Sequence, residues 1–135
     1  MAQNQTFENK NRYRDFDLSF GRNPLTNDIA KKTDENSINQ SMKQLLYTAY
    51  YERPFRPRVG TNLRKILFEP ADYITIGDLK AGIEEVITNY EPRINLIEVY
   101  VQDLSEINAY AVKIMYRFVN TDQARVVDIT LKRLR

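Results

Sequence analysis

The sequence predicts an α+β fold in which N-terminal helices pack on a C-terminal three-stranded antiparallel meander. In the first part of the chain, apolar residues recur at helical spacing over two stretches, about 34–50 and about 76–90. In the last part, three stretches rich in Ile, Val and Tyr alternate apolar and polar residues, which is typical of half-buried strands. Short polar segments separate these stretches, so we expect hairpin connections between them.

Length and composition favour one domain after a polar arm. The chain has 135 residues, of which 42% are hydrophobic, and its net charge is only +2. Residues 1–12 are polar and rich in amides, so we expect a flexible N-terminal arm there. Residues 13–135 are then predicted to form a single domain.

The region before the first helix predicts a short strand and a turn. Phe16, Leu18 and Phe20 alternate with polar residues, which predicts an extended segment with one apolar face. Residues 21–28 contain Gly, Asn-Pro and Asn-Asp, which are typical of turns.

The two main helices each show one apolar stripe. The first, about 34–50, can be capped by Asp34 or Asn36. The second, about 76–90, follows Thr75 and Asp78, which resemble a capping box, and Pro92 ends it. The stripes comprise Ile38, Met42, Leu45, Leu46 and Ala49 in the first helix, and Leu79, Ile83, Val86, Ile87 and Tyr90 in the second. Between them, a proline-containing loop is followed by a short apolar helix over residues 63–68.

Three strands are predicted at about 94–101, 109–119 and 125–134. The alternation of the first slips between Leu96 and Ile97, which predicts a β-bulge or burial on both faces. The third strand should lie at an edge of the sheet, anchored by its apolar face of Val127, Ile129 and Leu131. Its outer backbone groups would then be available to a strand from a partner, so we assign these three residues to partner binding.

Residue types argue against catalysis. The chain has no His and no Cys, which removes the usual general base, thiolate nucleophile and zinc ligands. Its glycines are isolated, so no phosphate-binding loop is present. We therefore expect no enzyme activity, no catalytic residues and no cofactor. No EF-hand spacing occurs, and we expect no metal, although a site built from carboxylates alone stays open.

A basic loop lies between the two main helices. Arg53, Arg56 and Arg58 alternate with aromatic and proline residues, and the basic segment extends to Lys65. Such a loop can bind single-stranded nucleic acid, or it can contact an acidic protein surface. We favour the protein surface because the charge of the whole chain is nearly balanced, and a small nucleic-acid-binding module is the alternative.

The chain resembles the sheath-initiator family of contractile-tailed phages, the small baseplate wedge subunit also called GPW-type or "lysozyme-like". The order and spacing of several short motifs carry the resemblance, and Glu91–Arg93 at a helix–strand junction is the most distinctive. The motifs are 17–20, 23–24, 27–29, Ile38, Ser41, 45–46, Thr48, 52–53, 56–57, Gly60, 67–70 and 91–94. Two positions depart from the pattern, since Tyr51 and Asn27 stand where the family usually has glycine.

The resemblance implies a structural subunit of the virion's tail baseplate, assembled in the host cytoplasm and present in six copies around the tail tube. Its implied partners are baseplate wedge proteins and the tail sheath protein, with tail tube or hub proteins as further candidates. From the absence of a long apolar run we expect no membrane contact, and the nearly balanced charge disfavours nucleic acid. The Glu91, Pro92 and Arg93 motif would dock to wedge proteins, and the strands would start sheath assembly. Without the resemblance, this motif indicates only a helix end with a surface ion pair. The "lysozyme-like" label implies a hydrolase, which the residue types do not support.

Overall fold

The computed structural model describes residues 13–119 and 121–133. The chain divides into two compact units, Met1–Gln40 and Ser41–Arg135, and the boundary falls inside helix α1, Asp34–Tyr47. The arm predicted over residues 1–12 lies outside the described residues. The single domain over 13–135 stays a prediction.

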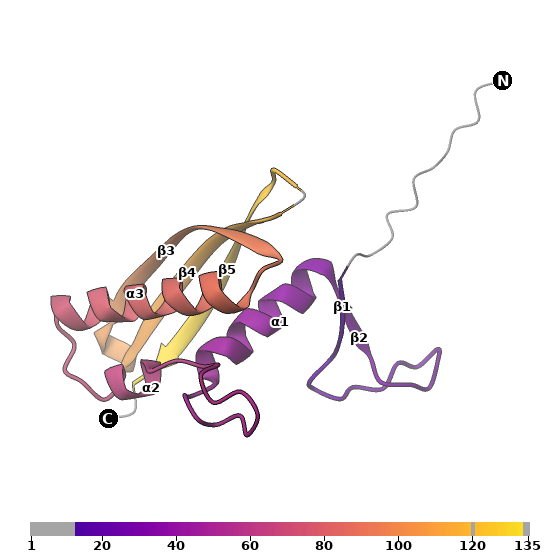
Figure 1. The fold of residues 1–135 in the computed structure, drawn as a ribbon, viewed down its shortest axis with the longest axis horizontal. Helices are drawn as coiled ribbons and strands as arrows, with labels where there is room; N and C mark the ends of the chain where they lie inside the picture. The colour runs from indigo at the N-terminus through magenta and orange to yellow at the C-terminus, as the bar shows by residue number, and fades with distance from the viewer. Residues whose placement is uncertain (1–12, 120, 134–135) are drawn as a thin grey trace. The chain divides into compact units, whose positions relative to one another are not determined.

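The first unit contains a short two-stranded ladder. Strand β1, Arg14–Phe16, pairs antiparallel with β2, Lys31–Thr33, which the sequence did not predict (Figure 1). The N–H of Ser19 donates to the Asp17 carboxylate at 3.0 Å, and this local turn follows the end of β1. The predicted apolar face is not buried, because Phe16 is 62% exposed and Phe20 is 69% exposed.

Helix α1 follows the predicted stripe, and its members from Ile38 to Leu46 are buried. The helix ends at Tyr47, three residues earlier than expected. The N–H of Thr48 still bonds to the carbonyl of Gln44, but the N–H of Ala49 donates to the Glu52 carboxylate at 2.8 Å. This side-chain bond takes the place of the next helical bond.

Two further helices follow. Helix α2, Leu63–Ile66, is shorter than predicted, and α3, Tyr73–Tyr90, begins three residues earlier than predicted. Asp72 caps α3 by accepting a hydrogen bond from the N–H of Thr75 at 2.7 Å. The predicted capping role of Thr75 is therefore wrong, because Thr75 lies within the first turn and donates its hydroxyl to the Pro70 carbonyl at 2.9 Å.

The second unit carries the predicted three-stranded sheet. Strands β3, Ile94–Leu104, β4, Ala109–Phe118, and β5, Ala124–Lys132, pair antiparallel in the order β3-β4-β5 (Figure 1). A short 3₁₀ turn, Ser105–Ile107, connects β3 to β4. The register shifts between Leu96 and Glu98, so the predicted bulge is confirmed.

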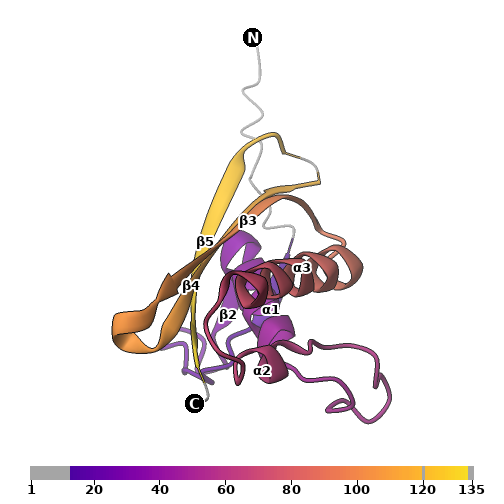
Figure 2. The same cartoon turned by 90° about the vertical axis from the view of Figure 1, so that its left-hand side faces the viewer.

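The core of this unit lies between the sheet and its helices. Helix α3 packs on β3 and α2 packs on α3, so both helices cover the same face of the sheet (Figure 2). The buried side chains of the sheet alternate along the strands and include Tyr110, Val112, Ile114, Tyr116, Val127, Ile129 and Leu131. The α+β fold with a C-terminal antiparallel meander is thus confirmed. Among the described residues, no helix combines the length and hydropathy that crossing a bilayer would require.

Candidate functional site

The outer edge of β5 presents backbone groups that no other strand satisfies. The N–H of Arg133 donates to the carbonyl of Asn108, and bonded pairs alternate along an antiparallel ladder. The backbones of Val127, Ile129 and Leu131 therefore face β4, and those of Val126, Asp128 and Thr130 point outward. Within the described part of the chain, no hydrogen bond reaches the outward groups of Val126 or Asp128. This half of the edge can accept another strand.

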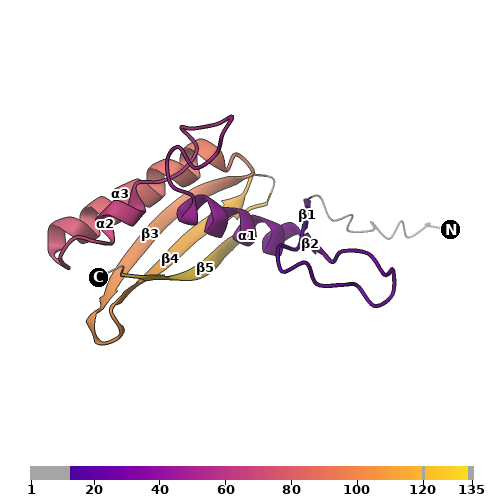
Figure 3. The same cartoon turned by 90° about the horizontal axis from the view of Figure 1, so that it is seen from below.

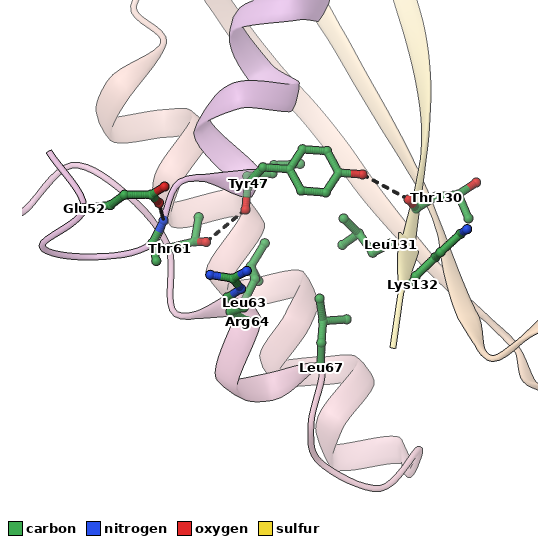
Figure 4. Close-up of a pocket in the computed structure, with 11 residues that line it drawn as sticks. Tyr47, Glu52, Thr61, Leu63, Arg64, Leu67, Thr130, Leu131 and Lys132 are labelled. Atoms are coloured by element: carbon green, nitrogen blue, oxygen red, sulfur yellow. Dashed lines mark hydrogen bonds between the residues drawn. The ribbon is translucent and has the colours of Figure 1, made fainter. Parts of the chain in front are cut away.

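At Thr130, a side chain from α1 reaches the outer edge of β5. The hydroxyl of Tyr47, at the end of α1, donates to the Thr130 carbonyl at 3.2 Å (Figure 4). A pocket of about 330 Å³ opens beside this bond, bounded by the end of α1, by α2 and by the last residues of β5. Leu63, Leu67 and Leu131 give it an apolar lining, while Arg64 and Lys132 lie on opposite sides of it (Figure 4). The open half of the edge therefore runs directly into an apolar pocket.

Strand β3 forms the opposite edge of the sheet (Figure 3). Its bulge at Ile97 interrupts the ladder, and bulges are one way in which proteins protect an edge from added strands. By the same alternation, the backbones of Val99 and Val101 point outward. The side chains of these two residues line a second pocket of about 260 Å³ with the first half of α3.

Glu91 and Arg93 form a pair within the chain. The guanidinium of Arg93 donates Nε and one terminal nitrogen to the two carboxylate oxygens of Glu91, at 2.5 and 2.7 Å. Glu91 is 2% exposed, and the Arg93 side chain is 25% exposed. A buried carboxylate needs such a partner, and bidentate pairing is the strongest form that arginine offers. The geometry gives this pair a role in fixing the α3–β3 junction, where the exposed Pro92 lies between the two partners.

The basic loop is exposed but ordered by hydrogen bonds. The N–H of Tyr51 donates to the Pro57 carbonyl at 2.8 Å, and the hydroxyl of Tyr90 donates to the Arg58 carbonyl at 2.7 Å. Arg53, Arg56 and Arg58 are all exposed, and Phe55 at the tip is 98% exposed. The loop thus presents both cations and aromatic rings to solvent.

The two departures from the family pattern share one backbone conformation. Tyr51 has φ +65° and Asn27 has φ +56°, both left-handed values that glycine adopts without strain. Asparagine tolerates this conformation, but a bulky residue does so at a cost of about 1–2 kcal/mol. The turn expected from a glycine is therefore kept by Tyr51, whose ring is 83% exposed.

The residues that the sequence analysis assigned to partner binding do not form one site in the structure. The core contains the side chains of Val127, Ile129 and Leu131, which are 6%, 4% and 2% exposed. The backbone groups on the outer edge of β5 belong instead to the residues between them. Glu91 to Arg93 and the three loop arginines lie at other places in the chain and form no common cluster with β5. Sequence reasoning missed Tyr47, whose place at the end of an apolar stripe was the only available signal.

The chemistry of these surfaces is that of protein contact. Among the described residues, no group of three or more His, Cys, Asp or Glu is placed to hold a metal ion. The pocket beside β5 has one carboxylate, Glu52, and its oxygen accepts the N–H of Ala49. Backbone edges, an apolar pocket and exposed arginines instead match the ways in which proteins bind extended segments of other proteins.

Comparison with known proteins gives the class. The family model described as baseplate wedge protein gp25 matches residues 32–123, so the chain belongs to this family of baseplate wedge proteins. It is a structural subunit of a contractile-tail baseplate, located in the tail baseplate of the virion. The baseplate wedge protein gp25 of Enterobacteria phage T4 is 29% identical over 105 residues, which cover 77% of this chain and 80% of that protein.

Solved structures share the fold. A putative tail lysozyme from Geobacter sulfurreducens aligns with a TM-score of 0.69 and 24% identity, over 75% of this chain and 92% of that one. A chain of the anti-feeding prophage baseplate aligns with a TM-score of 0.69 and 23% identity, over 82% of this chain and 89% of that one. At these identities the likeness concerns the fold alone.

Proposed function

We propose that this baseplate subunit starts assembly of the contractile sheath by accepting an extended strand of the tail sheath protein on the outer edge of β5. The observation that supports this is the regular outer edge of β5, where the N–H and carbonyl groups of Val126 and Asp128 have no partner among the described residues. An added strand would satisfy these groups and would gain affinity from main-chain bonds. The bulge in β3 favours β5 over the other edge.

Hydrogen exchange with and without the purified sheath protein tests this proposal. The amides of Val126 and Asp128 should become protected in the complex, while those of Val127 and Ile129, already bonded to β4, should change little. Protection confined to Val99 and Val101 would move the site to β3. Binding without new amide protection at either edge would contradict strand addition.

Docking to the other wedge proteins is the second part of the proposal, and the basic loop carries it. Arginine and aromatic residues are common at the centres of protein interfaces, and the loop exposes Arg53, Arg56, Arg58 and Phe55 together. Arg56→Glu should weaken binding to the wedge proteins, while Arg117→Glu, on an exposed position of β4, should not. Salt-dependent binding of oligonucleotides through the same arginines would instead favour the nucleic-acid alternative.

The Glu91–Arg93 pair has a different place in this proposal. The pair orders the junction at which α3 passes into β3, and its contact with wedge proteins would use the exposed Pro92 and the outer face of the guanidinium. Six copies of the subunit would surround the tail tube, as the family resemblance implies.

We further propose that the subunit does not hydrolyse peptidoglycan. Support comes from the residue types, since the chain has no His or Cys, and from the buried carboxylate Glu91 being paired with Arg93. Cell-wall cleavage by the purified chain that is abolished by changing a single Asp or Glu would contradict this.

A further inference from the structure

A pocket lies beside the end of β5, next to the outer edge of this strand. Its apolar lining includes Leu63 and Leu67 from the α2 region and Leu131 from β5. All three leucines are themselves buried in the core, at 2%, 7% and 2% exposure, so the walls of the pocket are fixed. A volume of about 330 Å³ lies at the lower end of the range for ligand sites, which suits a side chain better than a cofactor.

The rim of this pocket is basic. Arg64 and Lys132 are exposed, and neither side chain makes an ion pair or hydrogen bond with any described residue. Glu52 is the carboxylate of the lining, and it is already bound to the N–H of Ala49 at 2.8 Å. An occupant that brings a carboxylate to the rim would therefore meet two unpaired cations.

The position of the pocket sets how an added strand would end. The Tyr47 hydroxyl bonds to the outward carbonyl of Thr130, so it competes there with the N–H of an added strand for one of the two lone pairs. A partner strand that pairs with Val126 and Asp128 therefore meets the Tyr47 side chain at Thr130, and the pocket lies beside Thr130 and Leu131. A side chain at the end of the paired segment can enter it.

We infer that this pocket binds one large apolar side chain of the sheath protein's extended segment, next to an acidic residue that pairs with Arg64 and Lys132. This inference rests on the proposed strand addition and deepens it. The strand edge supplies sequence-independent main-chain bonds, whereas the pocket selects the segment and fixes its register.

A pocket-filling variant tests the inference. Ala49, which lines the pocket and is half-buried, is changed in Ala49→Leu, with Ala81→Leu on the exposed side of α3 as the matched control. Burial of a leucine-sized group accounts for about tenfold or more in affinity. Ala49→Leu should therefore bind the purified monomeric sheath protein at least about tenfold more weakly, and Ala81→Leu should bind like the wild type.

A charge-reversal pair repeats the test without changing the packing. Arg64→Glu at the rim should weaken binding, while Lys65→Glu, the next residue of α2 and equally exposed, should have little effect. Because both positions are exposed, these two variants should fold, and they test the pocket inference even if Ala49→Leu does not fold.

The outcomes separate this inference from the proposed function. Protection of the Val126 and Asp128 amides in the wild-type complex, together with unchanged affinity of Ala49→Leu and Arg64→Glu, overturns the pocket inference and leaves strand addition intact. Absence of that protection in the wild type removes both. Self-association that Ala49→Leu abolishes, with unchanged affinity for the sheath protein, would assign the pocket to a second copy of this chain and also overturn the inference.

Discussion

Strands β3 and β5 are the two edges of the sheet formed by the described residues, but they differ in regularity and in what lies beside them. β3 contains a bulge between Leu96 and Glu98, and α3 packs on it. β5 pairs with β4 in unbroken register from Ala124 to Lys132. Along β5, the Tyr47 hydroxyl bonds to the outward carbonyl of Thr130.

This difference indicates a division of roles between the two edges. A bulge removes the regular spacing that an added strand needs, so β3 is suited to holding the fold. A straight, unbulged edge keeps that spacing, so β5 is suited to binding. The ion pair of Glu91 and Arg93 lies at the start of β3, where it serves the fold, and the apolar pocket lies at the end of β5.

The largest expected effect is on the β3 side. Arg93→Ala leaves the buried Glu91 carboxylate without its bidentate partner, which should lower the free energy of unfolding by about 3 kcal/mol. Urea denaturation measures this, with Arg117→Ala on an exposed position of β4 as the control. Affinity for the sheath protein per folded molecule should not change. Unchanged stability with weaker binding to wedge proteins would instead make Arg93 a docking residue, as the family resemblance implies.

The second prediction concerns the β5 edge itself. Asp128→Pro removes an outward N–H and leaves the ladder to β4 intact, since proline is tolerated on the solvent side of edge strands. Sheath affinity should fall at least about tenfold, or about 1.4 kcal/mol. Titration calorimetry measures the affinity. Val101→Pro makes the same backbone change on β3, and its sheath affinity should equal that of Val101→Ala. Weaker sheath binding by Val101→Pro would show that β3, and not β5, receives the strand.

The third prediction concerns the Tyr47 cap. Tyr47→Phe removes a single hydrogen bond to the Thr130 carbonyl, so the free energy of unfolding should fall by about 1 kcal/mol. In the sheath complex, the Thr130 amide should gain protection from hydrogen exchange in this variant alone. Tyr100→Phe, which loses a bond to Glu98 at an exposed position, is the control. An unprotected Thr130 amide would show that something other than the hydroxyl ends the paired segment.

The smallest effect concerns α3, the helix that packs on β3. The N–H of Thr75 holds the pKa of Asp72 below its ordinary value of 3.8, because it bonds to the ionised carboxylate. The stabilisation is therefore complete above pH 3.8 and is lost as the pH falls through the lower pKa of the folded state. Urea denaturation between about pH 5 and pH 2 should show a steeper loss for the wild type than for Asp72→Asn, whose cap does not titrate. Parallel curves would contradict this cap.

The sequence predicted the meander well because its signal is local and repeated. Every second residue of β4 is fully buried, namely Tyr110, Val112, Ile114 and Tyr116. The alternation of apolar and polar residues in the sequence therefore corresponds to one buried face of the strand. The slip at Ile97 predicted the bulge for the same reason. Helix ends were less accurate, since single side chains decide them: Glu52 takes the N–H of Ala49, and Asp72 caps α3.

The candidate site was harder to predict, because its parts meet only in the folded chain. Tyr47 and Thr130 are separated by 83 positions, and no local pattern links them. The order of the strands did identify β5 as an edge strand, but its alternation marks the residues that face the core. The outward backbone groups belong to the alternate residues, whose polar and mixed side chains carry no signal of their own.

The Tyr47 cap also limits how tightly one copy can hold a partner. With Tyr47 bonded to Thr130, the stretch of edge before it offers the outward groups of only a few residues, Val126 and Asp128 among them, and each net hydrogen bond contributes only about 1 kcal/mol. A contact of this strength is reversible, so a wrongly placed strand can leave before its neighbours arrive. If the copies form the proposed ring, firm attachment would depend on several of them engaging one assembly together, because linked sites bind far more tightly than a single site. The short edge would thus allow error correction at early stages of assembly and permanence once the ring is complete.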